Sequence, residues 1–284
     1  MLKYLEPEND GLLMRPTGSW AAEKLDYLAR YINVFETAMR ERWKTRCYID
    51  LMAGPGKNLV RDSGVVLLGS PLLSLTTTYP FTHYFFADSS EENYQALRQR
   101  CETSPHSSQI TIRSGDCNDL VNEFVDLIKQ NDQYSLNLAF LDPEGFELRW
   151  ETVAKIATIR RIDLVINYPQ GGLNRLMPKV FDAADQNQID LFFGSLEWRQ
   201  IYKDGRNKSG LHRALIDHYK DKLHRLGYKQ VLRDDEVGDE PLIRNAQKNA
   251  PLYRLLFASK HSLGTDFWQK ITRRNVYGQG HLPF

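Results

Sequence analysis

The feature of this sequence that most constrains its fold is a short strand-like run that ends in a glycine turn. Residues 48–56 read Tyr-Ile-Asp-Leu-Met-Ala-Gly-Pro-Gly. Gly54 and Gly56 carry no side chain, so the backbone can turn tightly there and approach a ligand closely. The turn is not the dinucleotide fingerprint, because no third glycine follows and we expect a loop over residues 57–68 before the next helix. It predicts a nucleotide-like ligand at the edge of a sheet.

Beyond this turn, strand-like runs alternate with helical stripes, which is typical of βαβ units in a parallel sheet with helices on both faces. We expect a helix over residues 19–44 before the first strand. The last two runs, residues 228–233 and 252–257, have no helical stripe between them, so we expect them to be antiparallel. The sequence predicts an α/β, Rossmann-like sheet of seven strands, mostly parallel, with an antiparallel last strand. The intervening runs are residues 83–87, 109–113, 136–141 and 162–167.

Composition sets limits on what the chain can bind and where it works. With 37 Lys and Arg against 36 Asp and Glu, the net charge of +1 excludes a globally basic nucleic-acid coat but not a local basic groove. Cys47, Cys101 and Cys117 are widely spaced, which argues against a disulfide framework or a zinc site. No apolar run is long enough for a signal peptide or a membrane span. We expect a soluble cytoplasmic protein that binds no metal and no membrane.

Acidic residues follow three successive strands at the edge where the glycine turn lies. Asp50 ends the first strand, Asp88 with Ser89 follows the second, and Asp116 with Cys117 follows the third. A carboxylate at the second position is placed for two ribose hydroxyls, and one at the third for the exocyclic amine of an adenine. Each acid alone could equally be a helix cap. Their order predicts one ligand with an adenosine moiety.

With these motifs, the sequence resembles class I S-adenosylmethionine-dependent methyltransferases. The Asp-Leu-Met-Ala-Gly-Pro-Gly turn is similar to the family's first motif in its Asp-Leu-Phe-Ala-Gly-x-Gly form, frequent in enzymes that act on nucleic-acid bases. The resemblance implies S-adenosyl-L-methionine as cofactor, with Asp88 and Ser89 at its ribose and Asp116 and Cys117 at its adenine. The residues it implies for the methionine moiety are Asp50, Met52, Ala53, Gly54 and Gly56.

More narrowly, the chain is similar to the bacterial three-Cys-motif partner (TcmP) family over about residues 19 to 270. The stretches that carry this likeness include GSPLLSL, FADSSEEN, SGDCN, FLDPEGFELRW, FFGSLEW and PLYRLLFASKHSLGTDFW. The family is named for a neighbouring protein with three cysteines, so the resemblance implies such a partner and gives this chain's own cysteines no role. It does not settle what is methylated.

The chemistry is expected where the fourth strand ends, at Asp142-Pro143. In amino-methyltransferases this place carries an acid or amide, two prolines and an aromatic residue, which hold the target amine and stack on a flipped base. Here Glu144 and Gly145 replace the second proline and the aromatic, and Phe146 comes one position later. Asp142-Pro143 could also be a simple turn. Asn167, at the end of the fifth strand, is a second candidate wall of this pocket.

Two further segments complete the prediction. Lys24 lies on the first helix, where it could cover the cofactor or simply face solvent. The insertion over residues 168–210 mixes basic and aromatic residues that could contact nucleic acid, although balanced acids favour a helical lid with core aromatics. We expect residues 1–284 to form a single domain that methylates a nucleobase or another amino or hydroxyl group of a nucleic-acid substrate, and the resemblance favours the nucleobase. The alternatives are a non-catalytic cofactor-binding partner subunit and a nicotinamide dehydrogenase with a parallel sixth strand.

Overall fold

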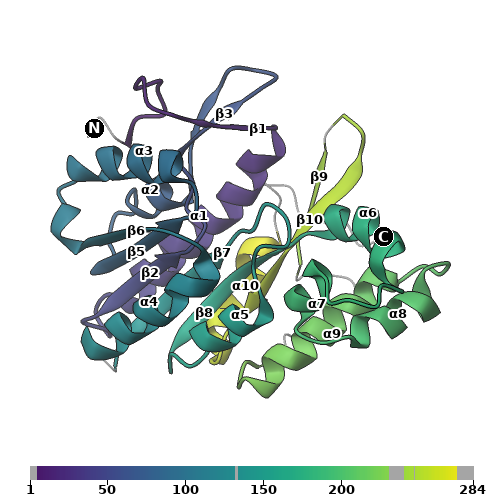
Figure 1. Cartoon of the computed structure of the whole chain (residues 1–284). Coiled ribbons are helices and arrows are strands. Elements are labelled where there is room, and N and C mark those ends of the chain that lie inside the picture. Colours follow the sequence, from purple (N-terminus) through teal and green to yellow (C-terminus); the bar gives the residue numbers. More distant parts are fainter. Residues whose placement is uncertain (1–4, 132–133, 230–239, 246, 274–284) are drawn as a thin grey trace.

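The computed structural model describes residues 5–131, 134–229, 240–245 and 247–273 (Figure 1). A seven-stranded sheet with the order β6-β5-β2-β7-β8-β10-β9 forms its centre. The first five strands in this order are parallel, and β10 runs antiparallel to both of its neighbours. The predicted α/β sheet with an antiparallel last strand is therefore confirmed. The strands are β2 (Arg46–Asp50), β5 (His83–Asp88), β6 (Ile110–Ser114), β7 (Leu136–Leu141), β8 (Ile162–Tyr168), β9 (Leu242–Asn245) and β10 (Ala250–Ala258).

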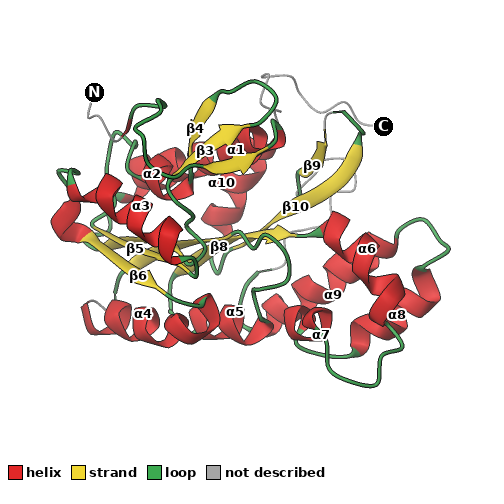
Figure 2. Ribbon diagram, turned by 45° about the horizontal axis from the view of Figure 1, so that its top comes forward, coloured by secondary structure: helices red, strands yellow, loops and turns green. Residues whose placement is uncertain are grey.

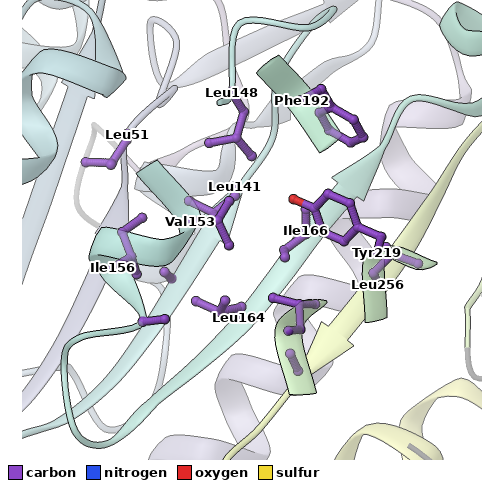
Figure 3. Close-up of a cluster of buried hydrophobic side chains, with 14 of the residues drawn as sticks. Leu51, Leu141, Leu148, Val153, Ile156, Leu164, Ile166, Phe192, Tyr219 and Leu256 are labelled. Atoms are coloured by element: carbon purple, nitrogen blue, oxygen red, sulfur yellow. The ribbon is translucent and has the colours of Figure 1, made fainter. Parts of the chain in front are cut away.

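Helices cover both faces of this sheet (Figure 2). Because successive side chains of a strand point to opposite faces, Tyr48 packs on one side while Cys47 and Ile49 pack on the other. Figure 3 shows the second side, where Leu141, Val153 and neighbouring residues make a continuous buried cluster. The first face carries α1 (Trp20–Met39), α2 (Ser70–Ser74), α3 (Glu91–Glu102) and α10 (Ser262–Thr272), and the second carries α4 (Cys117–Asn131) and α5 (Trp150–Ile156). A 3-10 helix, Ser107–Gln109, precedes β6.

The segment after the glycine turn differs from the prediction. Residues 57–68, expected as a loop, form a hairpin of β3 (Lys57–Val60) and β4 (Val66–Leu68). Strand β1 (Arg15–Thr17) pairs in parallel with β3 and completes a second, three-stranded sheet. The hairpin therefore brings the N-terminal segment beside the glycine turn. The first helix also ends earlier than expected, at Met39 rather than residue 44.

The strand beside β10 was predicted at the wrong place. Its partner is β9, whereas residues 228–229 of the predicted strand at 228–233 are not in a strand. Residues 230–233 lie outside the described part of the chain. Which segment pairs with β10 depends on contacts between distant parts of the chain, and a short local sequence pattern does not contain that information.

The insertion after β8 is helical. It holds α6 (Gln170–Val180), α7 (Gln188–Phe193) and α8 (Glu197–Gly205), and α9 (Leu211–Arg225) follows it. Phe192, Phe193 and Trp198 are fully buried, so these aromatics build a core and offer no stacking surface for nucleic acid. This is the helical arrangement that the balanced charges favoured. Of the described helices, none combines the length and apolar character needed to cross a membrane.

Candidate functional site

The carboxyl ends of β2, β5 and β6 meet at an acidic cavity of about 200 Å³. Met52, Asp88, Ser89, Asp116 and Cys117 all line it, so the structure brings together these predicted residues. Five lining side chains are carboxylates, and Arg15 is the only cation among them. A cavity with this charge favours a cationic ligand. The other carboxylates in its lining are Asp142, Glu144 and Glu147.

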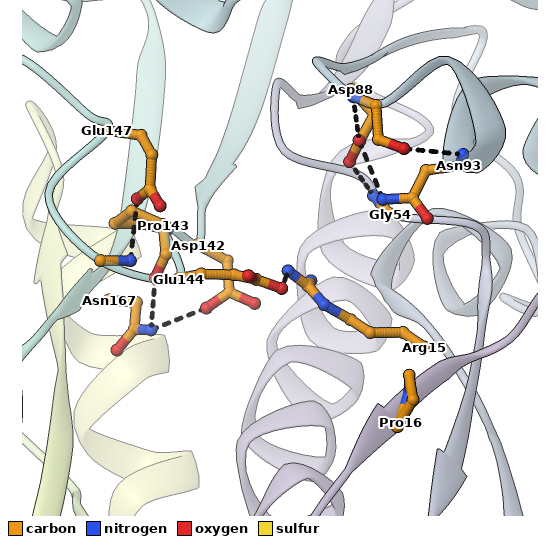
Figure 4. Close-up of polar contacts among 12 residues, drawn as sticks. Arg15, Pro16, Gly54, Asp88, Asn93, Asp142, Pro143, Glu144, Glu147 and Asn167 are labelled. Carbon is orange, nitrogen blue, oxygen red and sulfur yellow. Dashed lines mark hydrogen bonds and ion pairs between the residues drawn. The ribbon is translucent and has the colours of Figure 1, made fainter.

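Asp88 connects the glycine turn to the second strand (Figure 4). Its Oδ2 accepts the Gly54 backbone N–H at 2.7 Å, and its Oδ1 accepts Ser90 N–H at 2.9 Å and Asn93 Nδ2 at 3.0 Å. A carboxylate offers about four acceptor positions, so roughly one remains for a ligand hydroxyl. Gly54 and Gly56 adopt φ of +64° and +92°, the conformation that glycine permits.

Asp50 lies beneath the turn and lines none of the cavities at this edge. It is fully buried, its Oδ1 accepts Met52 N–H at 3.3 Å, and its Oδ2 has no hydrogen-bond partner. Burial raises the pKa of Asp50 to about 7, against the opposing effect of hydrogen bonds with the Ser70 side chain and the Met52 backbone, and the negative charges of Asp142 and Asp88 add to the rise. A positive charge on the ligand side of the turn would favour the ionised form.

The Asp116-Cys117 pair begins α4. Asp116 Oδ1 accepts the backbone N–H and the Nδ2 of Asn118, both at 2.7 Å, so this acid also caps the helix. Asn118 in turn donates to Glu147 O and accepts Arg149 N–H, which fixes the loop after β7 against α4. Cys117 is 4% exposed, and burial raises the pKa of its thiol to about 12. A neutral thiol therefore lines the cavity.

Asp142 lies at the end of β7 and is engaged on both oxygens. Its Oδ2 accepts Lys24 Nζ at 2.5 Å. Its Oδ1 accepts Asn167 Nδ2 at 2.8 Å (Figure 4). The Pro143 carbonyl is 3.5 Å from the same Nδ2. Asn167 is 4% exposed and its Oδ1 has no partner, so this oxygen is a free acceptor in a buried position. Lys24 is brought to Asp142 and does not line the acidic cavity.

Two further cavities adjoin Asp142 and Pro143. The central cavity, about 300 Å³, is lined by Lys24, Met52, Ala53 and Asp142 among others, and the outer cavity, about 430 Å³, extends toward α6. Both contain Pro143 and Asn167. The predicted site residues thus line the acidic, the central and the outer cavity, and Met52 and Asp142 line both the acidic and the central one. Asp50, Gly54 and Gly56 shape the edge from below.

Arg15 and Tyr253 belong to the site and were missed from the sequence. Arg15 pairs with Glu144, and both line the acidic and the central cavity (Figure 4). Tyr253 lies in the central and outer cavities; its hydroxyl is buried without a partner, and its pKa is well above 10 because of burial and the Asp142 charge. The alternation of β10 puts Tyr253 on the α1 side, but no local signal marks it as a pocket residue.

A buried ion cluster holds the N-terminal segment that carries Arg15. Asp10 pairs with Arg100 at 2.7 Å and with the fully buried Lys57 at 3.0 Å. Arg100 also donates to the carbonyls of Leu13 and Pro55, the residue between the two turn glycines. The cluster therefore ties this segment to the glycine turn.

No family model matches this chain, and no curated protein matches it. Several solved structures resemble it in the path of the backbone. An O-methyltransferase from Bacillus cereus in complex with SAH has a TM-score of 0.47 at 10% identity, over 88% of this chain and 85% of that one. A protein from Legionella pneumophila has a TM-score of 0.39 at 11% identity, over 57% of this chain and 76% of that one. The human methyltransferase 10 domain containing protein has a TM-score of 0.36 at 12% identity, over 83% of this chain and 82% of that one. At these values the function must be argued from this chain's own residues.

Proposed function

We propose that this chain is an S-adenosyl-L-methionine-dependent methyltransferase that acts on a nucleobase or on another amino or hydroxyl group of a nucleic-acid substrate. The observation that carries the proposal is that Asp142 lines both the acidic cavity and the central cavity. The central cavity is also lined by Asn167, whose buried Oδ1 has no hydrogen-bond partner. The sulfonium and ammonium groups of the cofactor are cationic, and they fit a lining of five carboxylates. Adenosine fits the edge formed by Asp88, Ser89, Asp116 and Cys117.

The sheet order supports this choice over a nicotinamide dehydrogenase. A dinucleotide-binding sheet has the strand order 3-2-1-4-5-6 and is mostly parallel. Here the antiparallel β10 is inserted between β8 and β9. The turn also lacks the third glycine of the dinucleotide fingerprint.

The residues around Asp142 would orient the methyl acceptor. When bound, S-adenosylmethionine supplies an activated methyl group on a positively charged sulfur. The bound cofactor would give this methyl group to the acceptor's lone pair, with the electron pair of the carbon–sulfur bond left on sulfur and the acceptor's proton released to solvent. Asn167 Oδ1 accepts the N–H or O–H of the acceptor and so aims its lone pair. Asp142 fixes the Asn167 amide, because its Oδ1 accepts from Nδ2.

The test is methyl transfer from tritiated S-adenosylmethionine to RNA, DNA and nucleosides. We expect Asn167→Leu to reduce transfer by about 100-fold, since a substrate donor loses its acceptor in a dry site. Asn207→Leu, an exposed change on the insertion, should keep full activity. Retained activity in Asn167→Leu would contradict the assigned role.

A specific observation favours a second candidate, a non-catalytic subunit that binds the cofactor and docks on a three-Cys-motif partner. Glu144 and Gly145 stand where amino-methyltransferases have a proline and an aromatic, and Glu144 pairs with Arg15 beside Asp142. If the chain binds S-adenosylmethionine and the partner but transfers no methyl group to any acceptor, and Asp142→Ala changes neither binding event, the subunit function is the right one.

A further inference from the structure

The charge of the cavities changes sign across Asp142. The acidic cavity has five carboxylates and one cation. The central and outer cavities, which share Trp20, Pro143, Glu144, Asn167 and Tyr253, together have two carboxylates and five cations. Those cations are Arg15, Lys24, Arg61, Arg175 and Lys179. On a chain with a net charge of only +1, this is a local basic site.

Two of these cations have no partner within the described chain. Arg15 is paired with Glu144 and Lys24 with Asp142, and Arg61 donates to the Pro16 carbonyl. Arg175 and Lys179, on α6, have neither an ion pair nor a hydrogen bond to any described residue, and both are exposed at the outer cavity. At a spacing of four residues they lie on one face of the helix and repel each other. An anion between them would remove that repulsion.

The remaining walls of the outer cavity suit a flat ring. Trp20, Phe146 and Tyr253 line it, and Phe146 lies against Gly172, where an added Cβ would be 3.2 Å from the ring. Aromatic side chains stack on bases of any sequence. The buried Asn167 Oδ1 and Tyr253 hydroxyl have no partners, so polar atoms are available to the edge of such a ring.

We propose that the methyl acceptor is a nucleotide whose phosphate is held by Arg175 and Lys179, while its base lies among Trp20, Phe146 and Tyr253. The proposal rests on the proposed methyltransferase function and adds the anionic character of the acceptor and the residues that select it. The phosphate can belong to a free nucleotide or to a unit of a polynucleotide. The insertion thus contributes to substrate binding through the exposed face of α6, while its aromatics remain in the core.

The test measures binding in the presence of saturating S-adenosylhomocysteine, with the full chain. The probes are the four ribonucleoside 5′-monophosphates, the matching nucleosides, and single-stranded DNA and RNA 12-mers. Tryptophan fluorescence reports binding, because Trp20 lies in the cavity. We expect at least one monophosphate to bind about tenfold more tightly than its nucleoside, as charge-assisted bonds to phosphate predict.

The double variant Arg175→Gln/Lys179→Gln should remove this tenfold preference and leave the nucleoside affinity unchanged. The control is Arg160→Gln/Lys208→Gln, which removes two exposed cations away from the outer cavity and should keep the preference. Tighter binding of the 12-mers, with a salt dependence that weakens in the Arg175/Lys179 variant, would assign the phosphate to a polynucleotide. Equal affinity for the 12-mers and a monophosphate would assign it to a free nucleotide.

Three outcomes overturn the proposal: no preference for phosphate in the wild type, an unchanged preference in the Arg175/Lys179 variant, or no binding of any probe. S-adenosylhomocysteine affinity is measured separately for each protein and should be equal in all of them. If the wild type does not bind S-adenosylhomocysteine, the proposed methyltransferase function fails. In that case the preference for phosphate is measured by titrating the same probes in the absence of S-adenosylhomocysteine.

Discussion

Replacing Asp50 by asparagine should make the chain's stability less sensitive to pH. Asp50 is fully buried and its Oδ2 has no partner, and its pKa is raised from 3.8 to about 7. The folded chain therefore keeps a proton that the unfolded chain releases between these values. A raised carboxyl pKa contributes stability at low pH, and this contribution is lost as the pH rises toward 7. The amide side chain of the variant cannot ionise and avoids that loss.

The size of the effect follows from the shift. Each pKa unit corresponds to about 1.4 kcal/mol, so about three units set an upper bound near 4 kcal/mol. Between about pH 5 and about pH 7, we expect the free energy of unfolding of Asp50→Asn, minus that of the wild type, to rise by roughly 2–3 kcal/mol. Urea unfolding across this range measures it. Other buried acids, such as Glu36 and Asp163, titrate in both proteins and cancel in the difference.

Asp126→Asn, which removes one exposed carboxyl on α4, is the matched control and should not reproduce this rise. A difference for Asp50→Asn that stays constant from about pH 5 to about pH 7 would refute the reasoning. It would mean that Asp50 is ionised throughout this range, and that burial with the neighbouring Asp142 and Asp88 does not hold its proton.

Two further changes test how the turn is held. Gly56→Ala should cost roughly 3 kcal/mol in urea unfolding, because φ is +92° and the new Cβ would lie 3.1 Å from Leu72 and Leu97; Gly64→Ala, at φ +70° in open space, should cost about 1 kcal/mol. Asp10→Asn should cost about 3 kcal/mol near neutral pH, because Lys57 and Arg100 lose their carboxylate. The Arg100 and Lys57 bonds lower the pKa of Asp10, so the wild type's advantage over Asp10→Asn should shrink as the pH falls below about 4. Equal costs for the two glycines, or a pH-independent cost for Asp10→Asn, would contradict these assignments.

The sequence allowed the sheet and its acidic edge to be predicted because both depend on local patterns. Buried parallel strands read as short apolar runs, and each acid directly follows one of them. The hairpin over residues 57–68 was missed although a signal was present. Leu59-Val60 and Val65-Val66 flank Asp62-Ser63-Gly64, and Gly64 adopts φ +70° in the turn.

The parts of the site that could not be predicted depend on contacts between distant segments. Arg15 reaches the site because Asp10 and Arg100, 90 residues apart, form an ion pair that fixes the N-terminal segment. Asn167 offers a free oxygen because Asp142, 25 residues away, occupies its Nδ2. Neither relation leaves a pattern in the neighbouring sequence. The motif at Asp142 allowed the position of the pocket to be predicted. Which side chains contact Asp142 there is known only from the structure.

The most direct test of the central claim is calorimetric titration of the full chain with S-adenosylhomocysteine and, in parallel, with NAD. The acidic cavity, the glycine turn and the antiparallel β10 predict saturable binding of S-adenosylhomocysteine and no binding of NAD. Asp88→Ala should weaken that binding, because Gly54 loses the carboxylate that holds the turn. Tight binding of NAD with no response to S-adenosylhomocysteine would contradict the account.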